Sequence, residues 1–193
     1  MANKGDFDLL LIGVGQSIFE GSLLGKILGF TTRIINPEKI INQVTGKENL
    51  FENLPFEDRT RLILSKSKVP VGVLIDKGFT EAGKVFIPIF NEKDIFLIKY
   101  AQKLINNSES QIIVLDAAGQ IKNTPQFKET IRSIEQTAPN YISLQSEQII
   151  EKEFLDQQDL MLISIDSWKK LVEAKSLWLS DMPSALILRD INQ

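Results

Sequence analysis

Residues 159–165 read Asp-Leu-Met-Leu-Ile-Ser-Ile, and residues 8–14 read Asp-Leu-Leu-Leu-Ile-Gly-Val. Each stretch is typical of a short apolar strand, followed by apolar residues at helical spacing and by a second apolar strand containing a proline near its start. These second strands are predicted at 69–76 and 182–188. A full run of strands and helices precedes the second copy, whereas only residues 1–7 precede the first. We therefore expect the chain to be a piece of a longer protein.

The strands are continuous apolar runs, which is typical of a sheet covered on both faces. Ahead of the second copy, the pattern predicts strands at 85–90, 111–115 and 141–144 and helices at 94–105, 125–137 and 147–154. Strands that alternate with helices favour a parallel sheet with right-handed crossovers. We predict an α/β fold with a mostly parallel sheet and helices on both faces.

The first copy carries an insertion at about residues 31–68, where the second copy is far shorter. Asn36-Pro37-Glu38 predicts a helix start, because it combines an N-cap residue, a proline at the first helical position and an acid in the first turn. A second amphipathic helix is predicted at 56–64. The insertion is therefore expected to be helical.

Composition excludes several classes of function. The 193 residues carry a net charge of −3 and no Lys/Arg cluster with interleaved aromatics, which argues against nucleic-acid binding. Cysteine and histidine are both absent, so thiolate nucleophiles, Ser–His triads and the usual zinc sites are excluded. Any metal would need oxygen ligands, such as magnesium on a phosphate. No apolar stretch approaches the ~20 residues that cross a bilayer, so we expect a soluble region without direct membrane insertion.

The order of elements predicted over residues 84–193 resembles the universal stress protein domain, including the proline ahead of the last strand. Residues 8–76 resemble the end of a preceding domain of the same kind. The resemblance implies a Rossmann-like three-layer fold. It divides the chain into a partial unit at 1–83, which holds the last two strands and the insertion, and a complete unit at 84–193. We expect the two to form one compact globular region.

A second resemblance is more specific. Residues 13–26 read Gly-Val-Gly-Gln-Ser-Ile-Phe-Glu-Gly-Ser-Leu-Leu-Gly-Lys, and residues 31–37 read Thr-Thr-Arg-Ile-Ile-Asn-Pro. This segment resembles a part of cation/proton (sodium/hydrogen) antiporters of Bacteroidetes, in which a cytoplasmic region similar to stress proteins follows a membrane transporter. The resemblance implies a regulatory, ligand-sensing domain at the cytoplasmic face of the inner membrane. Its partner would be the membrane-embedded region of the same polypeptide.

One segment is a candidate nucleotide or anion site. Gly13 and Gly15 lie where a strand ends before a helix, so flexible backbone N–H groups can approach a phosphate there. Gly21 and Ser22 add a backbone donor and a hydroxyl. The alternative interpretation is structural, because glycines also permit a tight turn and close packing of a helix on a sheet.

The glycine spacing departs from the pattern of the nucleotide-binding relatives. ATP-binding stress proteins carry Gly-x2-Gly-x9-Gly-Ser/Thr after this strand, whereas Gly15 lies too close to Gly21-Ser22, and residues 164–168 of the second copy contain no glycine. The segment is neither a Rossmann fingerprint nor a P-loop. No cofactor is firmly predicted; the candidate ligands are an adenine nucleotide or another anion, and a free-standing adenine-nucleotide-binding protein similar to universal stress proteins is the alternative function.

Catalysis is not expected. Ser17 and Ser22 have no base partner at local spacing, so a hydrolase or transferase of the adenine-nucleotide α-hydrolase type is only a third reading. The strand-end acids Asp76, Asp116 and Asp166 either hold a ribose hydroxyl or magnesium, or simply end strands and cap helices. The large aromatic residues are expected in the core; they are Phe19, Phe96, Trp168 and Trp178.

The proline-led strands at 70–76 and 184–188 leave two arrangements open. At a sheet edge they would pair with a second copy of the chain and form a homodimer. Alternatively, the two related strands pair with each other inside one chain.

Overall fold

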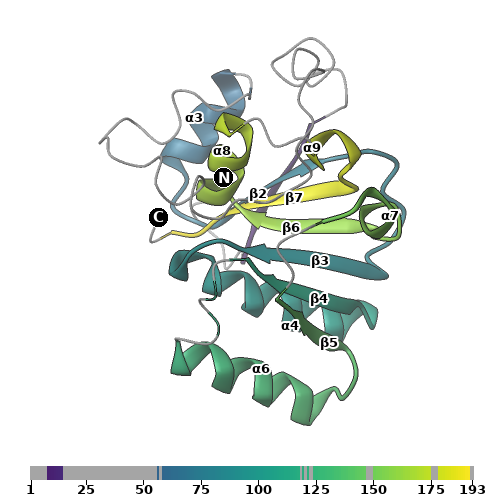
Figure 1. Cartoon of the computed structure of the whole chain (residues 1–193). Helices are drawn as coiled ribbons and strands as arrows, with labels where there is room; N and C mark the ends of the chain where they lie inside the picture. Colours follow the sequence, from purple (N-terminus) through teal and green to yellow (C-terminus); the bar gives the residue numbers. More distant parts are fainter. Residues whose placement is uncertain are drawn as a thin grey trace.

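The computed structural model describes residues 8–14, 56, 58–117, 119, 121, 124–146, 150–174 and 178–191. The strands are β1 (Leu10–Val14), β2 (Val71–Ile75), β3 (Lys84–Ile89), β4 (Gln111–Asp116), β5 (Ile142–Gln145), β6 (Leu160–Ser164) and β7 (Ser184–Arg189). The helices are α3 (Asp58–Lys66), a 3-10 turn η1 (Glu92–Phe96), α4 (Leu97–Ser108), α6 (Pro125–Thr137), α7 (Lys152–Leu155), α8 (Ile165–Glu173) and α9 (Trp178–Asp181). Together they form an α/β fold, as predicted (Figure 1).

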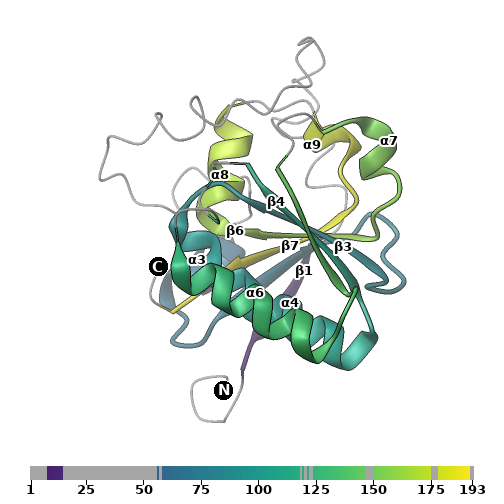
Figure 2. The same cartoon turned by 60° about the horizontal axis from the view of Figure 1, so that its bottom comes forward.

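One seven-stranded sheet runs through the structure in the order β1-β2-β7-β6-β3-β4-β5. All neighbours are parallel except β2 and β7, which are antiparallel. Helices α4 and α6 cover one face, and α3 and α8 lie on the other, with α7 and α9 (Figures 1 and 2). Phe127 of α6 belongs to the core under the first face, and Leu64 of α3 and Trp168 of α8 to the core under the second. The sheet is therefore covered on both faces.

The sheet changes direction between β3 and β6. From β3 the chain winds outward through β4 to β5, and it then returns to the other side of β3 with β6 and continues to β7. β3 and β6 are parallel neighbours, with Val85 beside Leu160 and Phe86 beside Met161. Their carboxyl ends therefore meet at a topological switch point, where open α/β sheets bind their ligands.

The two proline-led strands pair with each other, so the internal arrangement is confirmed and the edge arrangement is wrong. When residues 71–75 are aligned with 185–189, their pairing is symmetric: Val73 lies opposite its counterpart Ile187, and Ile75 lies opposite Ala185. Such pairing is the isologous contact of a twofold symmetric dimer, here within one chain. The strands at the two edges of the described sheet are β1 and β5.

The two copies of the pattern have the same register when their aspartates are aligned. Leu10 lies beside Val71, and it is the second residue after Asp8. Met161 lies beside Ala185, and it is the second residue after Asp159. Leu10 and Met161 also pack against the same core, so the two aspartates correspond in space, whereas the two prolines are offset by one residue.

Helix boundaries differ from the prediction in three places. The helix predicted at 94–105 starts earlier, as η1, and continues as α4 to Ser108. The helix predicted at 147–154 is shorter in the structure, because Ile150 and Glu151 are not helical and α7 begins at Lys152; residues 147–149 lie outside the described residues. Of the insertion, α3 is described, whereas residues 31–55 are not. The division of the chain at residues 83 and 84 stays a prediction.

Candidate functional site at the strand switch point

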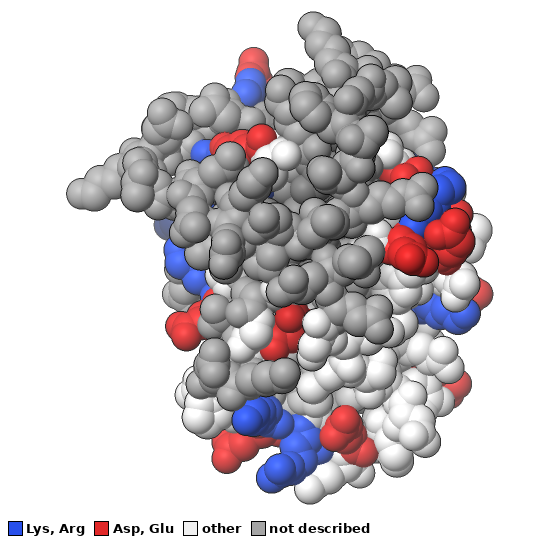
Figure 3. Space-filling view, viewed as in Figure 1, with Lys and Arg blue, Asp and Glu red and all other residues white. Residues whose placement is uncertain are grey.

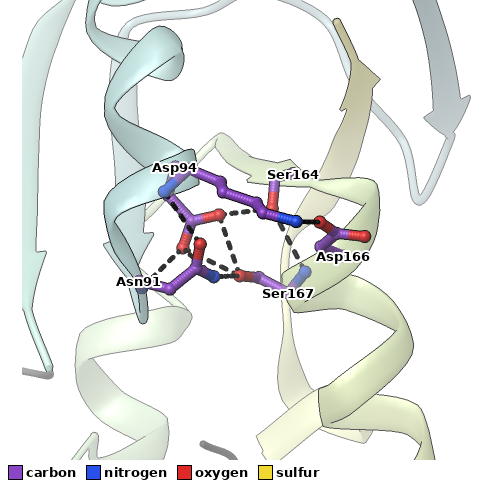
Figure 4. Close-up of polar contacts among 6 residues, drawn as sticks. Asn91, Asp94, Ser164, Asp166 and Ser167 are labelled. Atoms are coloured by element: carbon purple, nitrogen blue, oxygen red, sulfur yellow. Dashed lines mark hydrogen bonds and ion pairs between the residues drawn. The ribbon is translucent and has the colours of Figure 1, made fainter. Parts of the chain in front are cut away.

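A polar cluster lies where the carboxyl ends of β3 and β6 meet (Figure 4). Asn91 follows β3 and caps η1, and Ser164 is the last residue of β6 and caps α8. Asp94 of η1 and Ser167 of α8 point toward each other between these two caps. The cluster thus combines the starts of two helices at the position where the topology predicts a ligand crevice.

The start of η1 is a reciprocal cap. Asn91 Oδ1 accepts a hydrogen bond from the backbone N–H of Lys93 at 2.9 Å, and Asp94 Oδ2 accepts from the backbone N–H of Asn91 at 3.1 Å. The N–H of Phe90 also donates to Asp94 Oδ2, at 2.8 Å. Because an Asn-x-x-Asp sequence can satisfy the free N–H groups of a helix start in this way, the chain turns into η1 directly after β3.

Two serines of the second strand–helix unit complete the cluster. Ser164 Oγ accepts a hydrogen bond from the backbone N–H of Ser167 at 3.1 Å and donates to Asp94 Oδ1. Ser167 Oγ lies 2.9 Å from Oδ1 and 2.8 Å from Oδ2 of Asp94. Asn91 Nδ2 donates to Ser167 Oγ at 3.1 Å and to Asp94 Oδ2 at 3.2 Å. One carboxylate therefore holds both helix starts.

Asp94 is fully buried. Burial raises the pKa of its carboxyl above the ordinary value of 3.8, while hydrogen bonds from Ser164, Phe90 and Ser167 act in the opposite direction. The partial positive charge of a helix start favours a negative group at this position, and phosphates bind proteins at helix N-termini for the same reason. The side chain of Asp94 thus lies beside the start of α8 and contacts the hydroxyls of Ser164 and Ser167, while Ser164 Oγ accepts from the N–H of Ser167.

The geometry does not expose a reactive group. Asp94, Ser164 and Ser167 are all completely inaccessible to solvent. At the rim, Lys93 Nζ lies 3.7 Å from Asp166 Oδ2, and the Lys93 side chain is 72% exposed. The described cluster joins β3 and η1 to β6 and α8.

The sequence pattern predicted Asp94 only as the first residue of a helix and not as a member of a site. A signal was present: Asn91 and Ser164 each follow an apolar strand, and each has a polar residue three positions later. Asn-x-x-Asp and Ser-x-x-Ser after two strands both indicate helix caps. That the two caps share one carboxylate depends on β3 and β6 being neighbours, which only the fold shows.

The predicted nucleotide site lies at another strand. Gly13 is an exposed residue of β1 that pairs with Leu74. No described atom lies within 4 Å of the position that a Cβ of residue 13 would take, so close packing does not require a glycine there. Gly15, Gly21 and Ser22 lie outside the described residues. The four residues of that prediction are therefore neither brought together nor separated by the described part of the chain.

The strand-end acids have structural roles in the fold. Asp76 Oδ1 accepts hydrogen bonds from the N–H groups of Gly78 and Phe79, both at 2.8 Å, and Gly78 takes a φ of +92° in this turn. Asp116 Oδ2 accepts from the N–H of Ile121 at 3.1 Å. Asp166 lies in the first turn of α8, beside Lys93. These contacts favour the interpretation of all three as turn and cap residues.

Two of the four aromatic residues expected in the core can be placed. Trp168 is fully buried, and Phe96 is partly buried against the core beneath α4 and α6. Phe19 and the side chain of Trp178 lie outside the described residues. Figure 3 shows Lys and Arg mixed with Asp and Glu on the described part of one face, without a large patch of a single sign.

Metal ligands and membrane-spanning helices were both sought among the described residues. No group of three or more Asp and Glu side chains there is arranged to hold a metal ion. No helix among them has the length and apolar character needed to cross a membrane.

Comparisons with known protein families and with curated proteins gave no match. No protein-family model matches the chain. No curated protein matches it either.

Proposed function

We propose that this chain is a non-catalytic, cytoplasmic regulatory domain of a cation/proton antiporter. The observation that supports the proposal is the buried cluster at the switch point, where Asp94 is hydrogen-bonded to the hydroxyls of Ser164 and Ser167. Such a unit, whose two strand ends are joined by its own buried side chains, is suited to a regulatory rather than a catalytic role. The antiporter assignment itself rests on the sequence resemblance of residues 13–37.

The internal pairing of β2 with β7 supports a role in which the two related parts act together. Val73 lies opposite Ile187 and Leu74 opposite Leu186, so both parts contribute to one continuous sheet. A displacement of β2 would therefore also displace β7, to which it is hydrogen-bonded. Regulation then requires that the domain contacts the two states of the transporter with different affinity.

The test is ion transport by the intact protein reconstituted in vesicles, compared with a variant that lacks residues 5–193. We expect removal of the domain to shift the pH dependence or ligand dependence of transport. Asp94→Ala should shift it in the same direction, and Lys93→Gln, at a side chain that is 72% exposed at the rim, serves as its control. Identical transport profiles with and without the domain would contradict regulation.

The second candidate function is adenine-nucleotide binding at the end of β1. It is favoured by the exposure of Gly13 near the carboxyl end of that strand, where the space beside the backbone is open. It predicts a rise in melting temperature with ATP, AMP or a cyclic dinucleotide, and the loss of this rise in Gly15→Val. No rise with any of the three at millimolar concentration would rule this candidate out.

A further inference from the structure

The strand β1 has a described neighbour on one side only, unlike the strand that corresponds to it. β6 lies between β7 and β3, and all five of its residues are buried. β1 pairs with β2 alone, its Leu11 side chain is 57% exposed, and Gly13 is exposed. Under the internal twofold relation of β2 and β7, the open side of β1 corresponds to the side of β6 that β3 occupies.

The backbone directions of β1 define which groups face the open side. Leu10 N donates to Pro70 O at 2.9 Å, and Val14 O accepts from Asp76 N at 3.4 Å, so these residues face β2. In a parallel strand, alternate residues direct both backbone groups to the same side. Leu11 and Gly13 therefore direct their N–H and C=O groups away from β2. On the corresponding side of β6 lies β3, with Leu160 beside Val85 and Met161 beside Phe86.

We propose that a parallel, apolar strand from the remainder of the antiporter polypeptide pairs with β1 through Leu11 and Gly13. This strand takes the place beside β1 that β3 has beside β6. The helix that follows it covers Leu11, as α4 follows β3 in the complete unit. The source of the strand, but not the open edge itself, rests on the proposed function.

The chemistry of the edge indicates what it accepts. β1 reads Leu-Leu-Ile-Gly-Val, without the charges or prolines by which edge strands are usually protected from further pairing. β6 corresponds to β1, and the strand beside β6 is β3. After Lys84, β3 has five buried residues, all of them uncharged. The partner strand is therefore expected to be uncharged over about five residues. A second copy of the chain related by a twofold axis would pair antiparallel instead.

The absence of cysteine allows a direct test of this edge. Leu11→Cys places one thiol on β1. Leu144→Cys is the control: it places a thiol on β5, the other edge strand of the described sheet, where the native side chain is 45% exposed. The rate of reaction with a maleimide is measured in the 193-residue chain and in the polypeptide that the native gene encodes. We expect Leu11→Cys to react at least about tenfold more slowly in the whole polypeptide, and Leu144→Cys to react equally in both.

Hydrogen exchange of the Leu11 and Gly13 amides provides the second measurement, because strand pairing protects backbone groups and simple coverage of a side chain does not. The expected result is slow exchange at both amides in the whole polypeptide only. Equal thiol reactivity in the two proteins, or protection already present in the 193-residue chain, would overturn the proposal. Protection that rises with the concentration of the 193-residue chain would assign the edge to a second copy and overturn it equally. If the domain proved not to regulate transport, the expected thiol reactivity and hydrogen exchange at β1 would stay the same.

Discussion

Ser167 Oγ lies 2.8 Å from Oδ2 of Asp94, although 73 positions separate the two residues in the chain. This contact connects the first turn after β3 with the first turn after β6, the two strands at which the sheet changes direction. In most sheets of this kind that place is open to a ligand. Here a side chain of the protein occupies it, and the first predictions concern that side chain.

Replacement of Asp94 tests how much the cluster contributes to stability. Asp94→Ala leaves the N–H groups of Phe90 and Asn91 without their buried acceptor, so we expect the free energy of unfolding to fall by about 3 kcal/mol. Asp94→Asn should cost less, because an amide oxygen can keep these bonds while its N–H donates to the serine hydroxyls. Denaturant unfolding measures both variants. A loss below about 1 kcal/mol for Asp94→Ala would contradict the role of the carboxylate.

The stability of the wild type should depend on pH through the same group. Burial raises the pKa of the Asp94 carboxyl, so the folded chain binds this proton more tightly than the unfolded chain. The resulting stabilisation is complete below pH 3.8 and is lost as the pH rises through the folded pKa. The stability of the wild type relative to Asp94→Asn should therefore decline with rising pH across that window. Unfolding at a series of pH values tests this, and a constant difference would contradict it.

Two glycines of neighbouring strands should respond oppositely to the same substitution. A Cβ at Gly72 would lie 3.0 Å from Leu186 Cδ1 and 3.3 Å from Leu11 Cδ1, so Gly72→Ala is expected to destabilise the fold by about 1–2 kcal/mol. At Gly13 the space is open, and Gly13→Ala should be neutral or stabilising by up to about 1 kcal/mol. Thermal unfolding of the two variants makes the comparison. Equal effects would show that β1 does not lie against β2 as described.

The two aspartates of the repeated pattern should differ in importance. Asp159 Oδ2 accepts a hydrogen bond from the N–H of Lys84 at 2.7 Å, whereas Asp8 makes an exposed ion pair with Lys103 at 3.2 Å. We expect Asp159→Ala to lower the free energy of unfolding by about 1 kcal/mol and Asp8→Ala to leave the melting temperature unchanged. Equal effects of the two substitutions would contradict the contact of Asp159 with the backbone of β3.

Much of the fold could be predicted because the buried strands are continuous apolar runs. The strands predicted at 85–90 and 111–115 differ from β3 and β4 by about one residue at each end. The pairing of β2 with β7 was only one of two open arrangements, since a proline-led apolar strand fits an edge or an interior equally well. The offset of the two prolines by one residue between the copies could not be predicted, because it shows only when the paired strands are compared.

The candidate site was less predictable than the fold. Local sequence indicates that Asn91 and Ser164 begin helices, but the shared carboxylate requires two strands that are distant in sequence to become neighbours. The glycine-rich segment predicted a nucleotide or anion site, because glycines line phosphate-binding loops in many α/β proteins. Of its four candidate residues, only Gly13 lies within the described part of the chain.

The central claim is that these 193 residues belong to a cation/proton antiporter. The most direct measurement is the sequence of the native reading frame upstream of Gly5. The account predicts about a dozen apolar segments of ~20 residues there, each long enough to cross a bilayer. A stop codon followed by a genuine start at Met1 would contradict it.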